Sequence, residues 1–435
     1  MTSRISEFQE DAISARTLLS AAAVRTSAER MLALAEGNSL AEWRLDMDRL
    51  PATADFVAKV VRERYPRLDP PVHARWRHFV FGGCDLWQDI VAKAKWANPA
   101  AAARAAFDLV LTSVLLDAGA GPDWSYVDAA TGIRAARSEG LALASLRWFE
   151  RGGLSDDPGD PLRVDAAALR RIDAGSIRMA FQVTESNPLL GTEGRAGLLN
   201  RLGTAVQAQP EFFAIADSSR PGGLFDALAG RAAGGALQLP AADILAMLLE
   251  TLGTIWQNRP TLGSVPLGDC WPHPAFGTGV GAEAGGWIGS GGAGRGGAAD
   301  RFVPLHKLSQ WLTYSLIEPL AGAEIVVCRI EELTGLAEYR NGGLFVDGAV
   351  LVPRDAAARR YAVSDPFVVG WRAMTVALLD RIAPMVGSRL GMTTAEFPLA
   401  NVLEGGTWAA GRLLARDKRP DGGPPFQITS DGTVF

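Results

Sequence analysis

The side chains best suited to take part in a reaction lie between residues 303 and 352. Lys307, Gln310 and Tyr314 recur at spacings of three and four, which places an amine, an amide and a phenol along one helix face. A second polar cluster, AEYRN at 337–341, runs into a pair of glycines whose backbone is unusually permissive. Because this density of functional groups exceeds what solubility requires, we predict the active site here.

This set of groups suits hydrolysis of an N-glycosidic bond. The transition state of that reaction resembles an oxocarbenium ion, so a carboxylate near the anomeric carbon is needed, and Glu338 supplies one. Lys307 and Arg340 are cations for a 5′-phosphate. The groups that can read a urea-like or base-like leaving group are Gln310, Tyr314 and Asn341. The alternative is that Glu338 and Arg340 form a structural ion pair.

Two further places carry candidate residues. Residues 70–90 contain arginines whose forked guanidinium groups can bind a phosphate or carboxylate through two hydrogen bonds. The candidate residues of this anion-binding clamp are Arg75, Arg77, His78 and Asp85. The alternative there is a loop with aromatic packing and arginines on the surface. Asp117 follows an Ala-rich helix, where the helix dipole disfavours a carboxylate. It therefore either caps a neighbouring backbone or serves as a second acid.

Other chemistries lack their signatures. The four histidines do not form HExxH, the three cysteines do not pair at metal-binding spacing, and GxSxG and Walker motifs are absent. A metal held by His73, His78 and Asp85 is the remaining metal alternative. Residues 276–299 are about half glycine but lack GK[ST], so we interpret them as a flexible insertion. We expect a site without metal or cofactor.

Bulk properties narrow the class of protein. The 435 residues carry a formal charge of −5, and their arginines are dispersed among carboxylates, which argues against a nucleic-acid partner. The N-terminus lacks the apolar core of a signal peptide, and no stretch approaches 18 uninterrupted apolar residues. We expect a cytoplasmic protein that acts on a small molecule and not at a membrane. The sequence leaves the oligomeric state open.

Apolar periodicity predicts the elements that must position these groups. Helices are expected at 101–116, at 137–149, from Leu305 to Leu320, and after Asp365-Pro366, while Asp347-Gly348 resembles a hairpin turn. Strand signals are few, so the fold is expected to be mainly α. We divide the chain into an N-terminal helical region (1–150), a middle helical region (151–275), the Gly-rich insertion and a C-terminal helical region (300–435) that carries the key site, all in one compact unit.

Several long strings resemble one known family. ARWRHF (74–79), LLDAGAG (115–121), RSEGLALAS (137–145), PLHKLSQWLTYSLIEPL (304–320) and LTGLAEYRNGG (333–343) look like the uracil-catabolism family of fungi and bacteria, the fourth protein of the URC route of pyrimidine degradation. The resemblance covers nearly the whole chain. It implies a role in degrading uracil through a ring-opened, ribose-bearing intermediate with urea as a product.

A second, more distant resemblance covers the C-terminal half. Queuosine 5′-phosphate N-glycohydrolases, whose fold is similar to that of helix-hairpin-helix DNA glycosylases, carry Lys-x-x-Gln on a helix and Ala-Asp-Tyr-Arg downstream. Here Lys307-x-x-Gln310 and Ala337-Glu338-Tyr339-Arg340 match in order and spacing. The departure is glutamate in place of the catalytic aspartate, which displaces the carboxylate. This resemblance implies a mainly α, multi-helix, glycosylase-like architecture.

Together these inferences predict a metal-free hydrolase that splits the N-ribosyl bond of ribosylurea or its 5′-phosphate. Glu338 and Asp117 are the candidate catalytic acids. The candidate substrate-binding residues are Lys307, Gln310, Tyr314, Arg340, Asn341, His306, Trp311, Arg75, Arg77, His78 and Asp85. Two alternatives stay open: a metal-dependent hydrolase of an amide or ureido bond in the opened pyrimidine, and a binding or scaffold subunit without catalysis.

Overall fold

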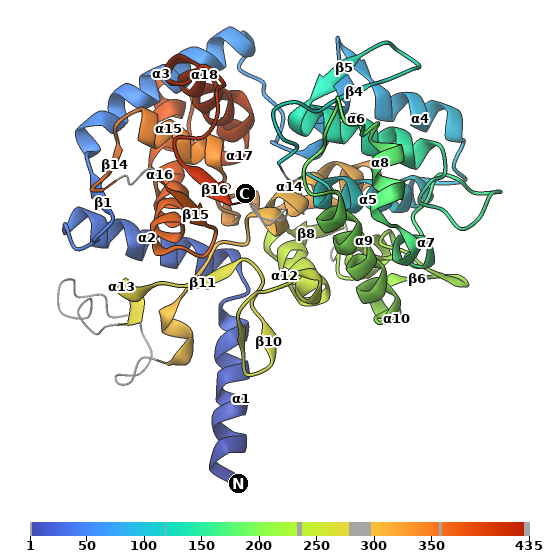
Figure 1. The fold of residues 1–435 in the computed structure, drawn as a ribbon, viewed down its shortest axis with the longest axis horizontal. Helices are drawn as coiled ribbons and strands as arrows, with labels where there is room; N and C mark the ends of the chain where they lie inside the picture. The colour runs from blue at the N-terminus through green and yellow to red at the C-terminus, as the bar shows by residue number, and fades with distance from the viewer. Residues whose placement is uncertain (1, 118, 233–236, 278–296, 356–358, 430–435) are drawn as a thin grey trace. The chain divides into compact units, whose positions relative to one another are not determined.

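The chain forms two compact units that are interleaved along the sequence. The computed structural model describes residues 2–117, 119–232, 237–277, 297–355 and 359–429 (Figure 1). Among the described residues, unit 1 combines those of 2–72, 258–307 and 331–429, and unit 2 combines those of 73–257 with 308–330. Each unit is therefore built from segments far apart in sequence, and each is described by itself.

The predicted mainly α class is confirmed. Helices make up most of the described chain, and every strand there is two or three residues long and pairs with a single partner strand. Short strands occur along the whole chain and not just near its C-terminus.

Unit 1 is built around one long helix. Its helices and helical turns are α1 (Thr2–Thr17), α2 (Ala21–Glu36), η1 (Met47–Arg49), α3 (Leu50–Arg64), α13 (Pro274–Gly277), η5 (Ala298–Arg301), η6 (Ile330–Glu332, whose first residue belongs to unit 2), α15 (Tyr339–Asp347), α16 (Pro366–Leu390), α17 (Leu399–Val402), the π-helix η7 (Leu403–Thr407) and α18 (Trp408–Lys418). Its strands are β1 (Trp43–Leu45), β9 (Thr261–Leu262), β10 (Val265–Pro266), β11 (Cys270–Pro272), β12 (Phe302–Pro304), β14 (Leu351–Pro353), β15 (Arg360–Ala362) and β16 (Gln427–Thr429).

Helix α16 begins as the sequence predicts. Asp365 is its N-cap and accepts a 3.0 Å hydrogen bond from the Phe367 amide, while Pro366 occupies the first turn, where a missing N–H does no harm. Its side chains are buried around most of its circumference, and it packs against α2, α3 and α15. An aromatic cluster surrounds its first turns, formed by Trp43, Tyr361, Phe367, Trp371 and Phe426.

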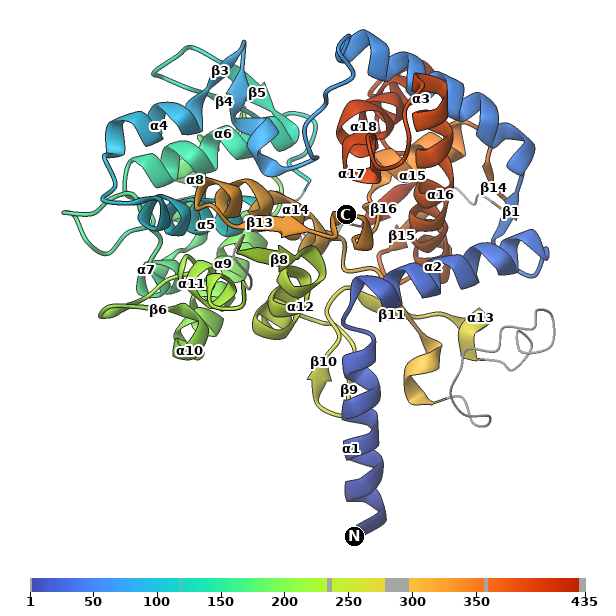
Figure 2. The same cartoon turned by 180° about the vertical axis from the view of Figure 1, so that it is seen from behind.

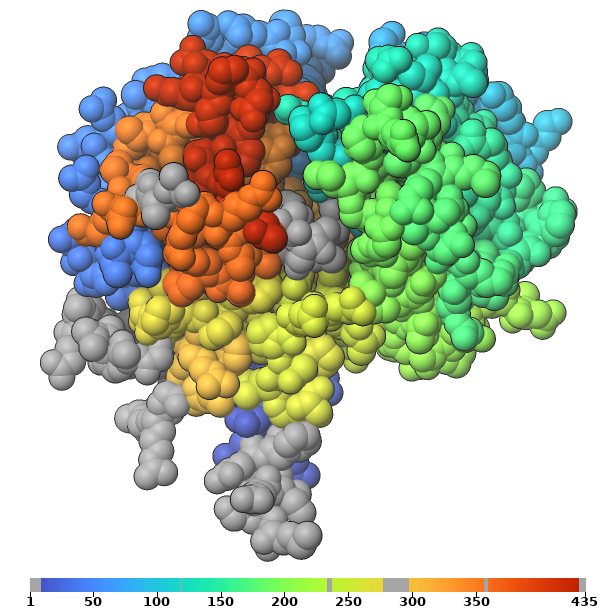
Figure 3. Space-filling view, in the orientation of Figure 1, coloured from blue at the N-terminus to red at the C-terminus, as the bar shows by residue number. Residues whose placement is uncertain are grey.

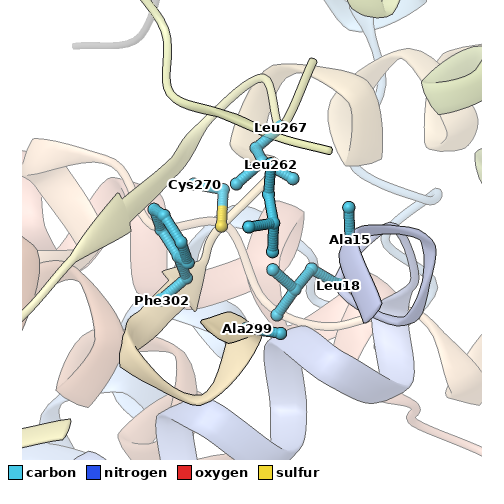
Figure 4. Packing of buried hydrophobic residues seen from close by; sticks show 7 residues of the cluster. All are labelled: Ala15, Leu18, Leu262, Leu267, Cys270, Ala299 and Phe302. Atoms are coloured by element: carbon cyan, nitrogen blue, oxygen red, sulfur yellow. The ribbon is translucent and has the colours of Figure 1, made fainter. Parts of the chain in front are cut away.

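A smaller apolar cluster of unit 1 lies between the end of α1 and the segment that contains β9, β11, η5 and β12. Figure 4 shows Ala15 and Leu18 packed beside Leu262, Leu267 and Cys270, with Ala299 and Phe302 completing the group. The strands β11 and β12 pair antiparallel here, with Trp271 opposite Val303. This pairing fixes the segment that leads into Lys307.

Unit 2 is also helical. Its helices are η2 (Arg75–Phe79), α4 (Leu86–Ala94), α5 (Pro99–Leu115), α6 (Arg137–Glu150), α7 (Ala166–Arg171), α8 (Ala174–Ala180), α9 (Thr192–Gln207), α10 (Pro210–Phe213), α11 (Gly223–Ala229), α12 (Ala241–Leu252), η3 (Gly253–Ile255) and α14 (Lys307–Gly322, whose first residue belongs to unit 1). Its strands are β2 (Val80–Phe81), β3 (Cys84–Asp85), β4 (Ser125–Val127), β5 (Arg134–Ala136), β6 (Ala214–Ile215), β7 (Ser218–Ser219), β8 (Gln238–Pro240) and β13 (Val326–Cys328). The strand β13 that follows α14 pairs in parallel with β8 (Figure 2).

The predicted helices at 101–116, 137–149 and 305–320 correspond to α5, α6 and α14. The predicted hairpin at Asp347-Gly348 is wrong. Residues 339–347 form α15 instead, because Leu344 and Phe345 are buried on its inner face and the Gly348 amide closes the helix by donating to the Leu344 carbonyl. The strand after it, β14, pairs with β1.

The predicted Gly-rich insertion at 276–299 lies largely outside the described residues. In the part of the chain that the structure covers, no helix combines the length and the apolar character that crossing a bilayer requires.

Candidate functional site

Glu338 is the N-cap of α15. Its two carboxylate oxygens accept hydrogen bonds from the amides of Arg340, at 2.8 Å, and Asn341, at 2.6 Å. The residue is 9 % exposed, so the carboxylate is held in one orientation at the edge of the interior. The helix dipole favours a negative charge at this end of α15. Glu338 therefore offers a fixed carboxylate that accepts hydrogen bonds.

A buried ion pair connects the two sequence motifs of unit 1. Asp269 and Arg372 form two hydrogen bonds of 2.8 and 2.7 Å, and both residues are nearly inaccessible to solvent. Arg372 also donates to the Ala337 carbonyl at 3.1 Å, directly before Glu338. Asp269 accepts from the Lys307 amide at 3.1 Å, at the start of α14. The pair thus ties the backbone of the Lys307 motif to that of the Glu338 motif.

The charge of Asp269 is stabilised by these same contacts. Burial alone would raise the pKa of its carboxyl, but the Arg372 guanidinium and the hydrogen bonds from Arg372, Trp271 and the Lys307 amide bring that pKa well below its ordinary value. Asp269 is therefore ionised at neutral pH and matches the Arg372 charge. Sequence reasoning missed this pair, because nothing in the local pattern indicates that residues 103 positions apart meet.

Arg340 is buried against aromatic rings. Its guanidinium carbon lies 4.3 Å from the centroid of the Trp408 ring and 5.3 Å from that of Tyr339. Such stacking is favourable for a guanidinium. Arg340 is 5 % exposed. The structure therefore brings Trp408, which the sequence did not single out, to the Glu338 motif.

Helices α15 and α18 run side by side in the same direction. Gly411 packs so closely on α15 that a Cβ there would collide with the Arg340 carbonyl. At the C-terminal ends of the two helices, Arg419 forms an ion pair with Asp347. The π-helix η7, which precedes α18 and also contacts α15, therefore lies at the Glu338 end of α15. In Figure 3 the red atoms of α18 are in view on the surface of unit 1.

The candidates on α14 are buried. Gln310, Trp311 and Tyr314 are at most 4 % exposed and follow Lys307 on this helix, in unit 2. His306 has a left-handed backbone, with φ +45°, at the entrance to the helix. Its Nε2 lies 2.9 Å from the Leu18 carbonyl, which can only accept, so Nε2 carries a proton. Burial lowers the His306 pKa. His306 is thus buried in unit 1 and hydrogen-bonded to the Leu18 carbonyl, and its role in substrate binding stays a prediction.

A second polar cluster occupies the interior of unit 2. Arg75 is fully buried and donates to Ser113 through Nε, at 2.8 Å, and to the Ser138 carbonyl, at 3.2 Å. Its Nη1 also lies 3.1 Å from Asp117 and 3.2 Å from Nδ1 of His78. Burial lowers the pKa of Arg75. Asp117 thus faces a buried guanidinium from the C-terminal end of α5, where the dipole alone would disfavour it.

His78 in this cluster is neutral at physiological pH. Burial and the adjacent Arg75 charge lower its pKa to about 4. Because Arg75 can only donate, Nδ1 of His78 is the acceptor and the proton sits on Nε2. The Trp311 ring lies beside this imidazole, with 5.9 Å between centroids, and beside Arg75. Glu139 contributes a further nearby negative charge that the sequence did not reveal.

The two remaining candidates do not join this cluster as direct partners. Arg77 forms an ion pair with Glu318 on α14, at the surface of unit 2. Asp85 is the N-cap of α4 and accepts from the amides of Trp87 and Gln88, at 3.0 and 3.1 Å. Within the described residues, no three His, Cys, Asp or Glu side chains are grouped as a metal site would require.

Fold and site together define a mainly α protein with a carboxylate fixed at a helix N-terminus beside a stacked arginine. A family model described as "protein of unknown function (DUF1688)" matches residues 17–435, so the chain belongs to this family. Protein urg3 of Schizosaccharomyces pombe is 37 % identical over 430 residues, which are 96 % of this chain and 98 % of that protein.

Uracil catabolism protein 4 of Lachancea kluyveri is 33 % identical over 421 residues, 90 % of this chain and 92 % of that protein. These matches confirm the resemblance to the uracil-catabolism family that the sequence strings indicated.

Proposed function

We propose that this protein acts in uracil catabolism as a hydrolase of an N-ribosyl bond. The substrate we infer is ribosylurea or its 5′-phosphate, which with one water would give urea and ribose or ribose 5-phosphate. The pathway rests on the name of a relative, uracil catabolism protein 4, which aligns over most of both chains. The reaction rests on the chemistry of the groups around Glu338.

The observation that carries the proposal is the geometry of the Glu338 carboxylate. Two backbone amides hold it, so its orientation does not depend on a flexible side chain. Each oxygen accepts one hydrogen bond from an amide and keeps a second lone pair that is free to interact with a substrate. A fixed negative charge of this kind stabilises the positive charge that develops on the ribosyl ring, or accepts a proton from the attacking water.

Other residues would bind the substrate. Arg340, stacked on Trp408, and Lys307, tied to the Glu338 motif through Asp269 and Arg372, are the cations that we assign to a 5′-phosphate. Asn341 remains the group that we propose for the leaving group, whereas the roles of Gln310 and Tyr314, which belong to unit 2, stay predictions from the sequence. The role of Asp117 as a second acid also remains a proposal, and its pairing with buried Arg75 favours a positioning role instead.

A glycosylase-like architecture is part of the same proposal. It is supported by the helical fold and by the match of Lys307-x-x-Gln310 and Ala337-Glu338-Tyr339-Arg340 to the motifs of queuosine 5′-phosphate N-glycohydrolases. Glutamate at 338 carries one methylene more than the aspartate of those enzymes. The longer side chain folds back to cap its own helix, which compensates in part for its length.

The test is a product assay on the whole protein after treatment with a chelator. Ribosylurea 5′-phosphate and UMP are supplied separately, and urea, uracil, ammonia and reducing sugar are followed. Urea and ribose phosphate appearing together support the proposal. Free uracil from UMP would retain the bond type and change the substrate. Ammonia without sugar release would instead support an amide or ureido hydrolase, and tight binding without any product would indicate a binding subunit.

A further inference from the structure

Two buried oxygens, one in the first turn of α15 and one in η7, which contacts α15, have no hydrogen-bond partner among the residues that the structure describes. They are Oδ1 of Asn341 and Oγ1 of Thr407, in residues that are 1 % and 0 % exposed. Buried polar atoms nearly always have a hydrogen-bond partner, because a buried polar atom without one costs about 1–3 kcal/mol of stability. Two such atoms in one region therefore need an explanation.

The orientation of the Asn341 amide is determined by its surroundings. Its Nδ2 donates to the Leu336 carbonyl at 3.3 Å. Rotating the amide would place Oδ1 against that carbonyl, where two acceptors repel each other. The group that remains for a ligand is therefore an acceptor, and it belongs to the first turn of the helix that Glu338 caps.

Thr407 reaches the same place from another element. It is the last residue of the π-helix η7, and α18 follows directly. The next residue, Trp408, stacks on Arg340 in the first turn of α15, and η7 contacts α15, so the Thr407 segment lies beside that turn. A π-turn shifts the following side chains relative to a regular helix, and such turns are frequent at functional sites.

The neighbouring residues of the π-helix are accounted for by packing. Glu404 accepts from the Tyr65 hydroxyl at 3.2 Å and lies 3.6 Å from the Arg64 guanidinium. Gly405 and Gly406 allow close approach to Pro70 and to Val57 of α3. The Thr407 hydroxyl is therefore the polar group that this packing leaves for another purpose, next to half-buried Trp408.

We infer that Asn341 and Thr407 form the subsite for the leaving group, and that they select an uncharged group bearing N–H donors next to a carbonyl, as a ureido group does. This inference rests on the proposed function and specifies its substrate class. Oδ1 of Asn341 would accept from the terminal NH2, and the Thr407 hydroxyl would donate to the ureido carbonyl or accept from its N–H. Both residues determine specificity, whereas the carboxylate of Glu338 faces the ribosyl carbon.

The test compares Thr407→Val with Thr407→Ser. Valine has the shape of threonine without the hydroxyl, and serine keeps the hydroxyl. Binding of urea is measured by calorimetry, and KM is measured with ribosylurea 5′-phosphate. We expect Thr407→Val to weaken urea binding and raise KM about tenfold, as loss of one hydrogen bond to a ligand does, and Thr407→Ser to stay close to wild type.

Two further readouts separate a subsite from a packing defect. Inhibition by ribose 5-phosphate should be unchanged in Thr407→Val, and its Tm without ligand should be equal or higher, because an unsatisfied hydroxyl has been removed. Equal urea affinity in wild type and Thr407→Val, or no urea binding by either, would overturn the subsite. Absence of urea release by the wild type would instead overturn the proposed reaction, while loss of urea binding in Thr407→Val would still support the subsite.

Discussion

Glu338 occupies a position that helices usually give to a shorter side chain. Asp, Asn, Ser and Thr are the common N-caps, because their oxygens reach the second and third amides of the helix directly. Glu338 makes the same two contacts by folding back, and both of its oxygens are used. The cap fixes the carboxylate, and the proposed reaction would use the lone pair that each oxygen keeps.

Two substitutions at this residue separate its roles. Glu338→Asp keeps a charged N-cap but moves the carboxylate, so we expect roughly a 10²-fold loss of urea release with a free energy of unfolding close to wild type. Glu338→Gln keeps the length and removes the charge, so we expect a loss of at least roughly 10²-fold in rate and about 1 kcal/mol in stability. Steady-state kinetics and chemical denaturation measure both effects. Near-normal turnover in Glu338→Gln would remove Glu338 from the mechanism, whereas near-normal turnover in Glu338→Asp would show that the exact position of the carboxylate does not matter.

His78 makes the stability of the protein depend on pH. Its pKa is about 4 in the folded state against an ordinary value of 6.5, because it is buried beside Arg75 and His73, with Asp117 and Glu139 opposing the shift. Above pH 6.5 it is neutral in both states. Between pH 6.5 and 4 the unfolded chain takes up a proton that the folded chain does not, so the folded state loses stability as the pH falls.

A substitution isolates this contribution from those of other groups. In His78→Asn an amide oxygen can still accept from Arg75, but nothing titrates at this position. Between pH 7.5 and pH 5, wild type should lose about 2 kcal/mol more unfolding free energy than the variant. Urea denaturation at the two pH values gives the comparison. The same pH dependence in both proteins would show that His78 does not carry it.

At the scale of elements, the site depends on how closely two parallel helices approach. Gly411 of α18 faces the Arg340 carbonyl and the side chain of Leu344, with no space for a Cβ. This contact places Trp408 within stacking distance of Arg340 and brings η7 to the N-terminal end of α15. Any added atom at Gly411 therefore has to push the two helices apart.

Gly411→Ala should accordingly destabilise the protein by about 1–3 kcal/mol, the usual range for overpacking. The matched control is Gly194→Ala on α9, where the site is exposed and nothing lies within 4 Å of the added Cβ. Helix propensity predicts that this control gains about 0.5–1 kcal/mol. Thermal unfolding compares the two variants, and an equal effect at both positions would contradict close packing at Gly411.

At the scale of the whole molecule, neither unit is a continuous piece of chain. Unit 2 needs helix α14 from a distant part of the sequence: Trp76 Nε1 donates to the Ser315 carbonyl at 2.7 Å, and the Arg75 amide donates to the Ser315 hydroxyl at 3.0 Å. Strand β13, which follows α14, pairs with β8. These contacts bury α14 side chains such as Leu312 and Leu316 within unit 2.

Truncation should reveal this dependence. Residues 73–257 alone expose the apolar surface that α14 covers, so we expect the fragment to aggregate or to lack near-UV circular dichroism. Joining 73–257 to 308–330 through a flexible Gly/Ser linker should restore a cooperative unfolding transition. A native-like near-UV spectrum from 73–257 alone would contradict the contact pattern.

The sequence by itself determined the helical class, the positions of four helices and the family. These follow from local information: apolar periodicity sets α5, α6 and α14, Asp365-Pro366 begins α16, and the long strings carry the family resemblance. The hairpin at Asp347-Gly348 failed because a turn signal of two residues is weaker than the burial of Leu344 and Phe345 on one helix face.

Only the tertiary structure decided which side chains surround the candidate carboxylate. Asp269 meets Arg372, Trp408 stacks on Arg340, and η7 contacts α15 because helices distant in sequence pack against each other. Such pairings depend on long-range burial and on where a glycine permits close approach. Neither quantity is encoded in the spacing of residues within a single segment, so periodicity identified the elements and packing selected the site.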